Sequence, residues 1–357
     1  MTPTEAFNTN PNAILVHSGV LFDVFNPTQE DIFIEDIAHA LSNLCRYGGH
    51  SPKFYSVAQH SVFCSLEAGT LQEQFDALMH DATEAYLIDL PRPIKRNIPK
   101  YIEIENVLQE KICQKYELTY PLSHRTHEVD NLVLQFEYTR FYDKVDKDFN
   151  FWSPEISKEY FLRRYDELKK AISEQKLIIE KEKILLRKNL SLVIRDVSDF
   201  PKPGVLFKDI TPVLYDSDLC SEIVNYFHKI YIDKKIDAVV GIESRGFFFG
   251  FLLASKLGVP FIPIRKPGKL PFTTVSIDYD LEYGSGKIEM NSDAIQPGMN
   301  VLVHDDLLAT GGTAAATAEL IKRQGGNISG FCFVINLAFL NGSEKLKPYS
   351  ENIEFII

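Results

Sequence analysis

The sequence predicts two domains: an all-α domain in the first half and an α/β domain with a mostly parallel sheet in the second. The chain has 357 residues, which is more than one domain usually holds. Apolar residues in the first half recur at helical spacing, whereas the second half alternates short β-branched runs with helical segments. We place the boundary near residue 174, which gives domains at 1–173 and 174–357.

The composition is that of an ordinary globular protein, and it narrows the classes of partner. Hydrophobic residues make up 45% of the chain, and the net charge is −11. Nucleic acid and anionic membranes repel an acidic chain, so neither partner is expected. The five cysteines are scattered without C-x-x-C spacing, and the first ten residues lack the basic start and apolar core of a signal peptide. Because no run of 18 apolar residues occurs, no membrane span is expected, and the features together predict a cytoplasmic protein.

The first half opens with one or two short strands within Val16–Asn26 and continues with helices. Ile37, Leu41 and Leu44 fall on one face of a segment that becomes helical at Ile34. Three prolines enforce a loop over 90–100. One helix is expected to begin at Ile34 and a second near Val57. Further helices are expected over about 73–86, 101–117, 124–144 and 156–189.

The last of these segments, 156–189, is charged and contains neither Gly nor Pro. It is typical of helix throughout. We interpret it as the last helix of the first domain followed by the first helix of the second. A coiled-coil or partner helix is the alternative.

Four residues of the first half have the chemistry of a metal site: His60, His80, Asp81 and Asp130. Two imidazoles and two carboxylates form a nitrogen and oxygen shell suited to one divalent transition metal (Mn, Co, Zn, Ni or Fe). Such an ion polarises a phosphate oxygen and lowers the pKa of a bound water, which makes a nucleophile near neutral pH. A single histidine is more often a core residue, so the hypothesis depends on all four residues meeting.

The stretches around these residues are VAQHSV, LMHDATEAYLIDLPRPIK and EVDNLV. They resemble the HD-superfamily metal-dependent phosphohydrolases, most closely the 5′-deoxynucleotidase type and related phage-type deoxynucleotide hydrolases. The resemblance covers about residues 12–150. It implies an HD-domain helical fold that hydrolyses phosphate from a (deoxy)nucleotide, with the four residues as metal ligands.

The same resemblance implies catalytic roles for Glu84 and Asp89. Glu84 lies one helical turn from Asp81 on the same face, where a carboxyl group can move a proton to or from the water or the leaving oxygen.

Two cations are candidates for phosphate binding in this half. Arg46 precedes His60 by 14 residues, close to where similar enzymes place a phosphate-binding Arg, and Tyr47 fills the aromatic position that follows. Lys95 is the second candidate. The alternative for both cations is a solvated surface charge.

The second half is organised around Met299–Ala316, with the sequence MNVLVHDDLLATGGTAAA. A short apolar strand is followed by two carboxylates, a loop of small residues and an Ala-rich helix. Glycines let the backbone approach an anion, and amides at the start of the helix can converge on a phosphate. The carboxylates then face sugar hydroxyls, which need acceptors. The carboxylates are Asp305 and Asp306, and the loop is formed by Ala309, Thr310, Gly311, Gly312 and Thr313.

This stretch resembles the phosphoribosyl pyrophosphate (PRPP) loop of type I phosphoribosyltransferases, and the wording DDLLATGGT resembles the adenine-specific group. The resemblance covers about residues 178–357. It implies transfer of the phosphoribosyl group from PRPP to adenine, giving AMP and pyrophosphate, with Mg²⁺ bound to PRPP. A Gly-rich turn without a ligand is the alternative.

The resemblance also implies a segment that recognises the base. Leu206, Phe207 and Lys208 stand where the family holds the purine between an aromatic and an aliphatic side chain. Some members carry Arg in place of Lys208, and Lys cannot make the planar contact of an Arg. Another 6-amino or 6-oxo purine is therefore the alternative to adenine.

Further segments of the second half match the family's pyrophosphate site and its mobile hood. The hood is expected over 271–290, where closure excludes water, with Glu282 near the reacting centre and Tyr283 beside it. The pyrophosphate-binding residues implied are Glu243, Ser244, Arg245, Arg265, Lys266 and Lys269.

Together the two resemblances predict a bifunctional enzyme of purine nucleotide metabolism. Its substrates are adenine, PRPP and nucleotides, and a homo-oligomer is expected by analogy. The fusion to an adenine-specific half favours an adenine nucleotide as substrate of the first half. Two alternatives stay open for the first half: a regulatory module that binds nucleotides without turnover, and a triphosphohydrolase that depletes deoxynucleotides.

Overall fold

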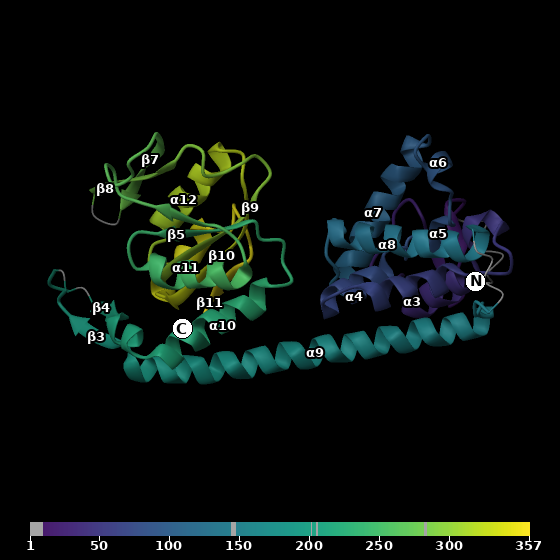
Figure 1. Cartoon of the computed structure of the whole chain (residues 1–357), viewed down its shortest axis with the longest axis horizontal. Coiled ribbons are helices and arrows are strands. Elements are labelled where there is room, and N and C mark those ends of the chain that lie inside the picture. The colour runs from purple at the N-terminus through teal and green to yellow at the C-terminus, as the bar shows by residue number, and fades with distance from the viewer. Residues whose placement is uncertain (1–9, 144–147, 201, 205, 282–283) are drawn as a thin grey trace. The chain divides into compact units, whose positions relative to one another are not determined.

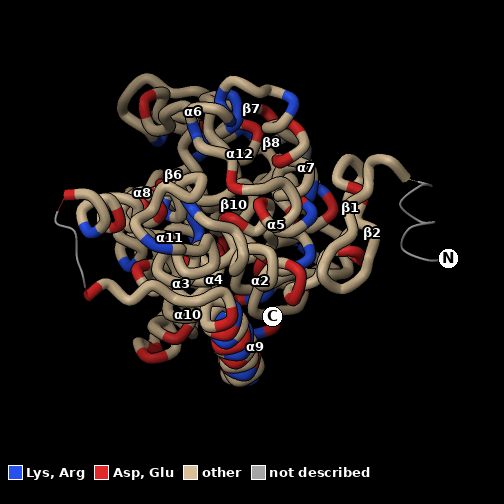
Figure 2. Tube along the Cα trace, turned by 90° about the vertical axis from the view of Figure 1, so that its right-hand side faces the viewer, with Lys and Arg blue, Asp and Glu red and all other residues tan. Residues whose placement is uncertain are grey.

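In the computed structural model the chain forms two compact units, residues 1–175 and 176–357 (Figure 1). The structure describes residues 10–143, 148–200, 202–204, 206–281 and 284–357. One helix, α9 (Pro154–Val193), runs without interruption through the point of division. The sequence had suggested two successive helices here. The structure joins them because no Gly or Pro follows Pro154 within the segment, and charged side chains of both signs recur along α9 (Figure 2).

The first unit is rich in helices, as predicted, and begins with a two-stranded antiparallel ribbon. Its core includes Phe22 of the ribbon and Leu41 of α2, both fully buried. The side chain of Ser56 caps the next helix, and Thr70 with Glu73 forms a capping box on the one after it. The elements are β1 (Ala13–Leu15), β2 (Leu21–Asp23), α2 (Ile34–Asn43), α3 (Val57–Glu67), α4 (Leu71–Met79), α5 (Glu84–Leu87), α6 (Arg92–Lys95), α7 (Pro99–Tyr116) and α8 (His124–Tyr138).

The helix predicted over 73–86 is wrong in its centre, because α4 ends at Met79 and α5 begins at Glu84. Between them, Ala82 N donates to Met79 O and Glu84 N donates to Asp81 O. These bonds span three residues instead of four and tighten the chain into a turn. His80 and Asp81 therefore lie at a break between helices rather than within one.

The second unit is an α/β domain whose main sheet is parallel, which confirms the predicted fold class. Five strands pair in the order β11-β10-β9-β5-β6, and every pair is parallel. The elements after α9 are β3 (Arg195–Ser198), β4 (Leu206–Asp209), α10 (Ser217–Tyr231), β5 (Ala238–Ile242), α11 (Gly246–Leu257), β6 (Phe261–Ile264), β7 (Thr274–Leu281), β8 (Gly284–Asn291), β9 (Asn300–Leu308), α12 (Gly312–Arg323), β10 (Asn327–Asn336) and β11 (Ile353–Phe355).

Helices cover both faces of this sheet (Figure 1). Successive residues of a strand point to opposite faces. Val239 and Leu302 accordingly belong to the cluster that includes residues of α10 and α11, whereas Val240 and Val303 belong to the cluster that includes residues of α12. Burial on both faces explains the continuous apolar runs in these strands.

The antiparallel hairpin β7–β8 corresponds to the predicted hood. Glu282 and Tyr283, to which the sequence gave roles there, lie outside the described residues. At the carboxyl edge of the sheet, β9 ends at Leu308 and β5 ends at Ile242, and both strands run into loops that lead to helices. Among the helices that the structure describes, none combines the length and apolarity needed to span a membrane.

Candidate functional site

His60, His80, Asp81 and Asp130, the predicted metal ligands, come together in the first unit. Helix α3 carries His60, α8 carries Asp130, and the break after α4 carries the other two. Nε2 of His60 lies 3.2 Å from Asp130 Oδ1 and 3.9 Å from Asp81 Oδ2. Nε2 of His80 lies 3.2 Å from Asp81 Oδ2 and 3.8 Å from Asp130 Oδ1. Four potential donor atoms therefore converge.

Hydrogen bonds direct both imidazole rings into this cluster. Nδ1 of His60 lies 2.6 Å from Glu137 Oε1, and Nδ1 of His80 lies 2.8 Å from the carbonyl oxygen of Ala77. With the proton on Nδ1, each ring leaves the Nε2 lone pair free to face the carboxylates. Nε2 of His80 is buried, and among the described residues it has the ion-pair contact with Asp81 but no aligned hydrogen-bond partner. The side chains present thus fit a divalent transition metal.

Glu137 is a member of the site that sequence reasoning missed. It is fully buried, and its carboxylate accepts hydrogen bonds from the hydroxyls of Tyr47 and Tyr55. Burial opposes its charge, but His60 and Arg46 hold the pKa of Glu137 at about 2. The signal in the sequence was its position two helical turns after the predicted ligand on α8, on the same face.

Arg46 lies inside the cluster and not on the surface. It is buried, with Nη1 3.3 Å from Asp81 Oδ2 and Nε 3.6 Å from Glu137 Oε2. Lys95 forms an ion pair with Glu105. The alternative of a solvated surface charge is therefore wrong for Arg46.

Arg92 is a second residue that the sequence reasoning did not single out. Its Nη2 pairs with Oδ2 of Asp130, the oxygen that does not face the histidines, and its Nη1 donates to Asn131 Oδ1 at 3.0 Å. No spacing rule pointed to this contact, because Arg92 lies between two prolines within the predicted loop. It holds one predicted metal ligand from outside the cluster.

Glu84 and Asp89 lie beside the cluster, as the resemblance implied. Glu84 opens α5 and is buried, and its Oε2 has no hydrogen-bond partner among the described residues. Burial raises the pKa of Glu84, and the negative charges of Asp81 and Asp89 raise it further. Burial also raises the pKa of Asp89. A raised pKa favours the protonated form of a carboxyl group, which is the form that can act as a general acid.

One cavity of about 900 Å³ opens beside the cluster and is large enough for a nucleotide. Its lining includes His80, Asp81, Glu84, Asp89 and Asp130. Its charged residues include four cations that can face phosphate, and tyrosines contribute aromatic surface that can face a base. The cations are Arg46, Arg92, Lys95 and Arg96, and the tyrosines are Tyr47, Tyr120 and Tyr138.

In the second unit, the predicted PRPP loop follows β9 at the carboxyl edge of the sheet and leads into α12. Gly311 has a φ of 74°, and a Cβ added there would collide with the carbonyl oxygen of Gly342. Only glycine can therefore hold this backbone position. The first amides of α12 lack intrahelical partners by geometry and are available to an anion.

Asp305 and Asp306 stand just before this loop, in the last residues of β9. Asp305 Oδ1 accepts a hydrogen bond from Asp306 N at 2.9 Å, and Asp306 Oδ2 lies 3.0 Å from Arg245 Nε. Burial raises the pKa of both carboxyls, and the neighbouring acid raises that of Asp305 further, while Arg245 opposes the rise at Asp306. Contacts within the protein thus fix the position of both carboxylates, where they can accept hydrogen bonds from hydroxyl groups.

Arg245 also connects this pair to the predicted base segment. Its guanidinium carbon lies 5.0 Å from the ring centroid of Phe207, within the range of cation–π attraction. Lys208 points elsewhere, because its Nζ lies 2.6 Å from Asp196 Oδ1 on the neighbouring strand. Leu206 is half exposed.

Four of the predicted pyrophosphate residues, Glu243, Arg265, Lys266 and Lys269, form one connected group, whereas Arg245 contacts Asp306 and Phe207 instead. Glu243 and Ser244 make the turn after β5, joined by a cis peptide bond. Glu243 Oε1 lies 3.2 Å from Arg265 Nη2, and Glu243 Oε2 accepts from Lys266 N at 2.8 Å. Arg265 Nη1 donates to Lys269 O at 3.2 Å. The turn therefore fixes the cationic segment.

Glu289, on the second hood strand, extends this network and was not predicted. It is buried, and its Oε1 accepts from Lys269 N at 3.2 Å. Its backbone also exchanges hydrogen bonds with Arg265. A single Glu in an alternating strand gives no signal of such a role.

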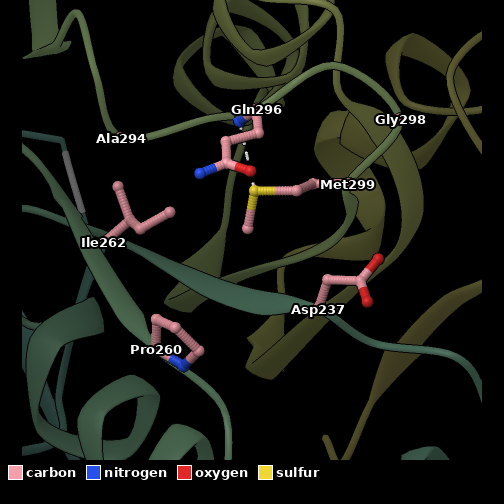
Figure 3. A pocket seen from close by; sticks show the side chains of 7 residues that line it. All are labelled: Asp237, Pro260, Ile262, Ala294, Gln296, Gly298 and Met299. Atoms are coloured by element: carbon pink, nitrogen blue, oxygen red, sulfur yellow. Dashed lines mark hydrogen bonds between the residues drawn. The ribbon is translucent and has the colours of Figure 1, made fainter.

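A smaller pocket of about 460 Å³ lies at the opposite, amino-terminal edge of the sheet (Figure 3). Asp237 and Met299 precede β5 and β9 there. The backbone N–H of Gln296 donates to Met299 Sδ, and the carboxylate of Asp237 accepts from the backbone N–H of Asn300. These polar groups are already paired within the protein, so we assign no site to it.

Comparison with known proteins agrees with the geometry of the second unit. Residues 217–356 match the profile of the phosphoribosyl transferase domain. The chain is 50% identical to the adenine phosphoribosyltransferase of Cytophaga hutchinsonii over 173 residues, which are 48% of this chain and 96% of that protein. It is 53% identical to the enzyme of the same name from Chloroflexus aurantiacus, over 48% of this chain and 100% of that protein.

A solved structure of adenine phosphoribosyltransferase from Rhodothermus marinus is 46% identical, with a TM-score of 0.47 over 48% of this chain and 98% of that one. The two sequence relatives are half identical or more and are matched over nearly their whole length. The chain therefore belongs, through its second unit, to the adenine phosphoribosyltransferase family.

Proposed function

We propose that the second unit transfers the phosphoribosyl group of PRPP to adenine, and that the first unit removes phosphate from a nucleotide. The activities are assigned to domains 174–357 and 1–173. The contact of Asp306 with Arg245, which also covers Phe207, supports the transferase because it joins sugar, pyrophosphate and base sites. The convergence of two imidazoles and two carboxylates supports the hydrolase.

In the transferase, each part of PRPP meets one group of residues. The loop 309–313 holds the 5′-phosphate through backbone amides, and Asp305 and Asp306 accept hydrogen bonds from the ribose hydroxyls. Phe207 packs against adenine. Mg²⁺, bound with PRPP, adds positive charge at the pyrophosphate. The C1′–O bond to pyrophosphate breaks, the bond from C1′ to adenine nitrogen forms, and adenine loses the proton of that nitrogen.

Catalysis in this unit is mainly electrostatic. Negative charge develops on the departing pyrophosphate, and fixed cations that face it lower the barrier. The cations are Arg245, Arg265, Lys266 and Lys269, of which Arg265 is oriented by Glu243. The roles of Glu282 and Tyr283 in the hood stay predictions, as does a homo-oligomeric state.

In the hydrolase, His60, His80, Asp81 and Asp130 would hold a divalent metal, which polarises a phosphate oxygen and acidifies a bound water. Glu84 is the proposed proton donor to the leaving oxygen, and burial together with Asp81 and Asp89 raises its pKa, which favours the protonated form. Arg46 faces the phosphate from within the cluster, and Lys95 is the second cation proposed for it. The presence of all four ligand groups with Glu84 beside them favours turnover over a purely regulatory role.

The full-length protein tests both activities with reciprocal variants. We expect AMP from adenine and PRPP, with rates for hypoxanthine and guanine lower by orders of magnitude. We also expect phosphate release from an adenine nucleotide when Mn²⁺ or Co²⁺ is supplied. Asp306→Asn should lower only the first activity, and His80→Asn only the second. Chromatography of orthophosphate against triphosphate separates a monophosphatase from a triphosphohydrolase, and absence of both products from all nucleotides disproves the hydrolase.

A further inference from the structure

Cys64 lies against the metal cluster of the first unit, although no ligand role was predicted for it. It follows His60 by one turn of α3, on the same face. Its Sγ lies 3.4 Å from Nε2 of His60, and its side chain is almost fully buried. The ligand atoms of His60, Cys64, His80 and Asp130 all lie within 4.8 Å of one another. The sulfur therefore belongs to the same compact group of potential ligand atoms as the two imidazoles and Asp130.

We propose that Cys64 is a thiolate ligand of the metal in this cluster, so that the resident ion is thiophilic, with Zn²⁺ or Co²⁺ preferred over Mn²⁺ and Mg²⁺. Thiolate ligands select zinc-like ions, whereas carboxylates and water suit Mn²⁺ and Mg²⁺. The inference rests on the proposed metal site of the first unit. It adds a sulfur donor to the two nitrogens and two carboxylates, and the thiol proton passes to solvent when the ion binds.

Two observations separate Cys64 from an ordinary core cysteine. First, Nε2 of His80 is buried, lies among the same atoms and has no aligned hydrogen-bond partner in the part of the chain that the structure describes, which points to a cation at this place. Second, Cys332 supplies an internal comparison. Its Sγ also contacts a buried histidine, His304, at 3.3 Å. Among the described residues, however, Cys332 and His304 do not belong to a group of three or more His, Cys, Asp or Glu side chains that could hold a metal ion. Contact between a thiol and an imidazole is thus not what singles out Cys64.

The absorption spectrum of the cobalt-loaded full-length protein tests the proposal directly. Co²⁺ bound to protein ligands gives weak bands in the visible, and a thiolate ligand adds an intense sulfur-to-cobalt charge-transfer band in the near ultraviolet. We expect both in the unaltered protein. Cys64→Ser should keep the visible bands and lose the near-ultraviolet band, whereas the control Cys332→Ser should keep both.

A competition titration with a chelator gives an independent measurement. Cys64→Ser should weaken Zn²⁺ binding by about tenfold or more and leave Mn²⁺ binding within about twofold, since loss of a metal-site group commonly costs 10–100-fold. Visible bands without a charge-transfer band in the unaltered protein would overturn the thiolate and leave the metal site standing. Absence of all cobalt bands would refute the metal site itself. Neither result requires the variant to fold.

Discussion

Oε1 of Glu137 lies 2.6 Å from Nδ1 of His60, and the same carboxylate lies 3.6 Å from Nε of Arg46. One buried acid therefore orients both a proposed metal ligand and the proposed phosphate-binding cation. Carboxylates that hold a ligating histidine in this way fix its tautomer and increase its basicity. Glu137 therefore links the proposed metal site to the proposed phosphate site. Neither the imidazole of His60 nor the guanidinium of Arg46 can turn without breaking its contact with Glu137.

Replacing Glu137 with Gln should weaken the first unit without affecting the second. The amide cannot carry the negative charge that His60 and Arg46 face, so we expect metal affinity and phosphate release to fall 10–100-fold. Isothermal titration with Zn²⁺ and a phosphate-release assay measure these losses. AMP formation by the second unit should be unchanged.

Glu128→Gln is the matched control for this variant, because Glu128 lies on the same helix but is exposed and pairs with Arg125 on the surface. It should lose less than twofold in both assays. Equal losses in the two variants would show that charge on α8 matters in general and that Glu137 has no special role.

Arg245→Lys should slow AMP formation although the charge is kept. Lys lacks the planar group that lies over Phe207 and the Nε that meets Asp306. The loss of both contacts predicts a fall in kcat/KM of roughly 10–100-fold, or about 1.4–2.8 kcal/mol, with KM raised for adenine and for PRPP together. Steady-state kinetics with each substrate varied in turn measures this.

Arg323→Lys provides the comparison, since Arg323 is exposed on α12 and pairs with Glu319 of the same helix. Its kinetics should be those of the unaltered protein. A rise in KM for PRPP alone in Arg245→Lys would contradict the link to the base site that we derive from Phe207.

His304 predicts how the stability of the second unit depends on pH. It lies on β9 and is fully buried, and burial lowers its pKa to about 4. The unfolded chain, with a pKa of about 6.5, binds the proton first, so stability is complete above pH 6.5 and falls as the pH drops toward 4. Between pH 7.5 and 5 this group alone should cost about 2 kcal/mol.

The transferase activity itself reports this loss. Samples are held in urea at each pH, and the AMP formed is then measured at one fixed pH, which follows unfolding of the second unit alone. His304→Gln has no proton to gain and should flatten the profile between pH 6.5 and 5. A slope that persists in the variant would assign the pH dependence to carboxyl groups instead.

The sequence was sufficient for features that depend on local pattern or on contiguous motifs. The buried strands and the small-residue loop before α12 follow from such patterns, and the four predicted ligands stand in short motifs. Arg92 and Glu289 could not be found in this way, because their partners come from other elements of the chain. The spacing from Asp130 placed Glu137 on the same face of α8, but its contact with His60 comes from a distant helix. The helical spacing also hid the break at His80, where bonds that span three residues replace the regular ladder.

Gly311→Ala and Gly258→Ala form a matched pair that tests the PRPP loop. Both glycines have positive φ, 74° and 71°, so alanine at either position should cost about 1–2 kcal/mol from backbone strain alone. Around Gly258 an added Cβ meets nothing within 4 Å, whereas at Gly311 it collides with Gly342 O. We therefore expect Gly258→Ala to keep normal kinetics despite its lower stability, and Gly311→Ala to displace the loop and raise KM for PRPP at least about tenfold. Urea titration separates the two effects, since strain lowers stability in both variants and displacement alters PRPP binding in one. Similar KM values for the two variants would show that the loop does not approach the phosphate closely.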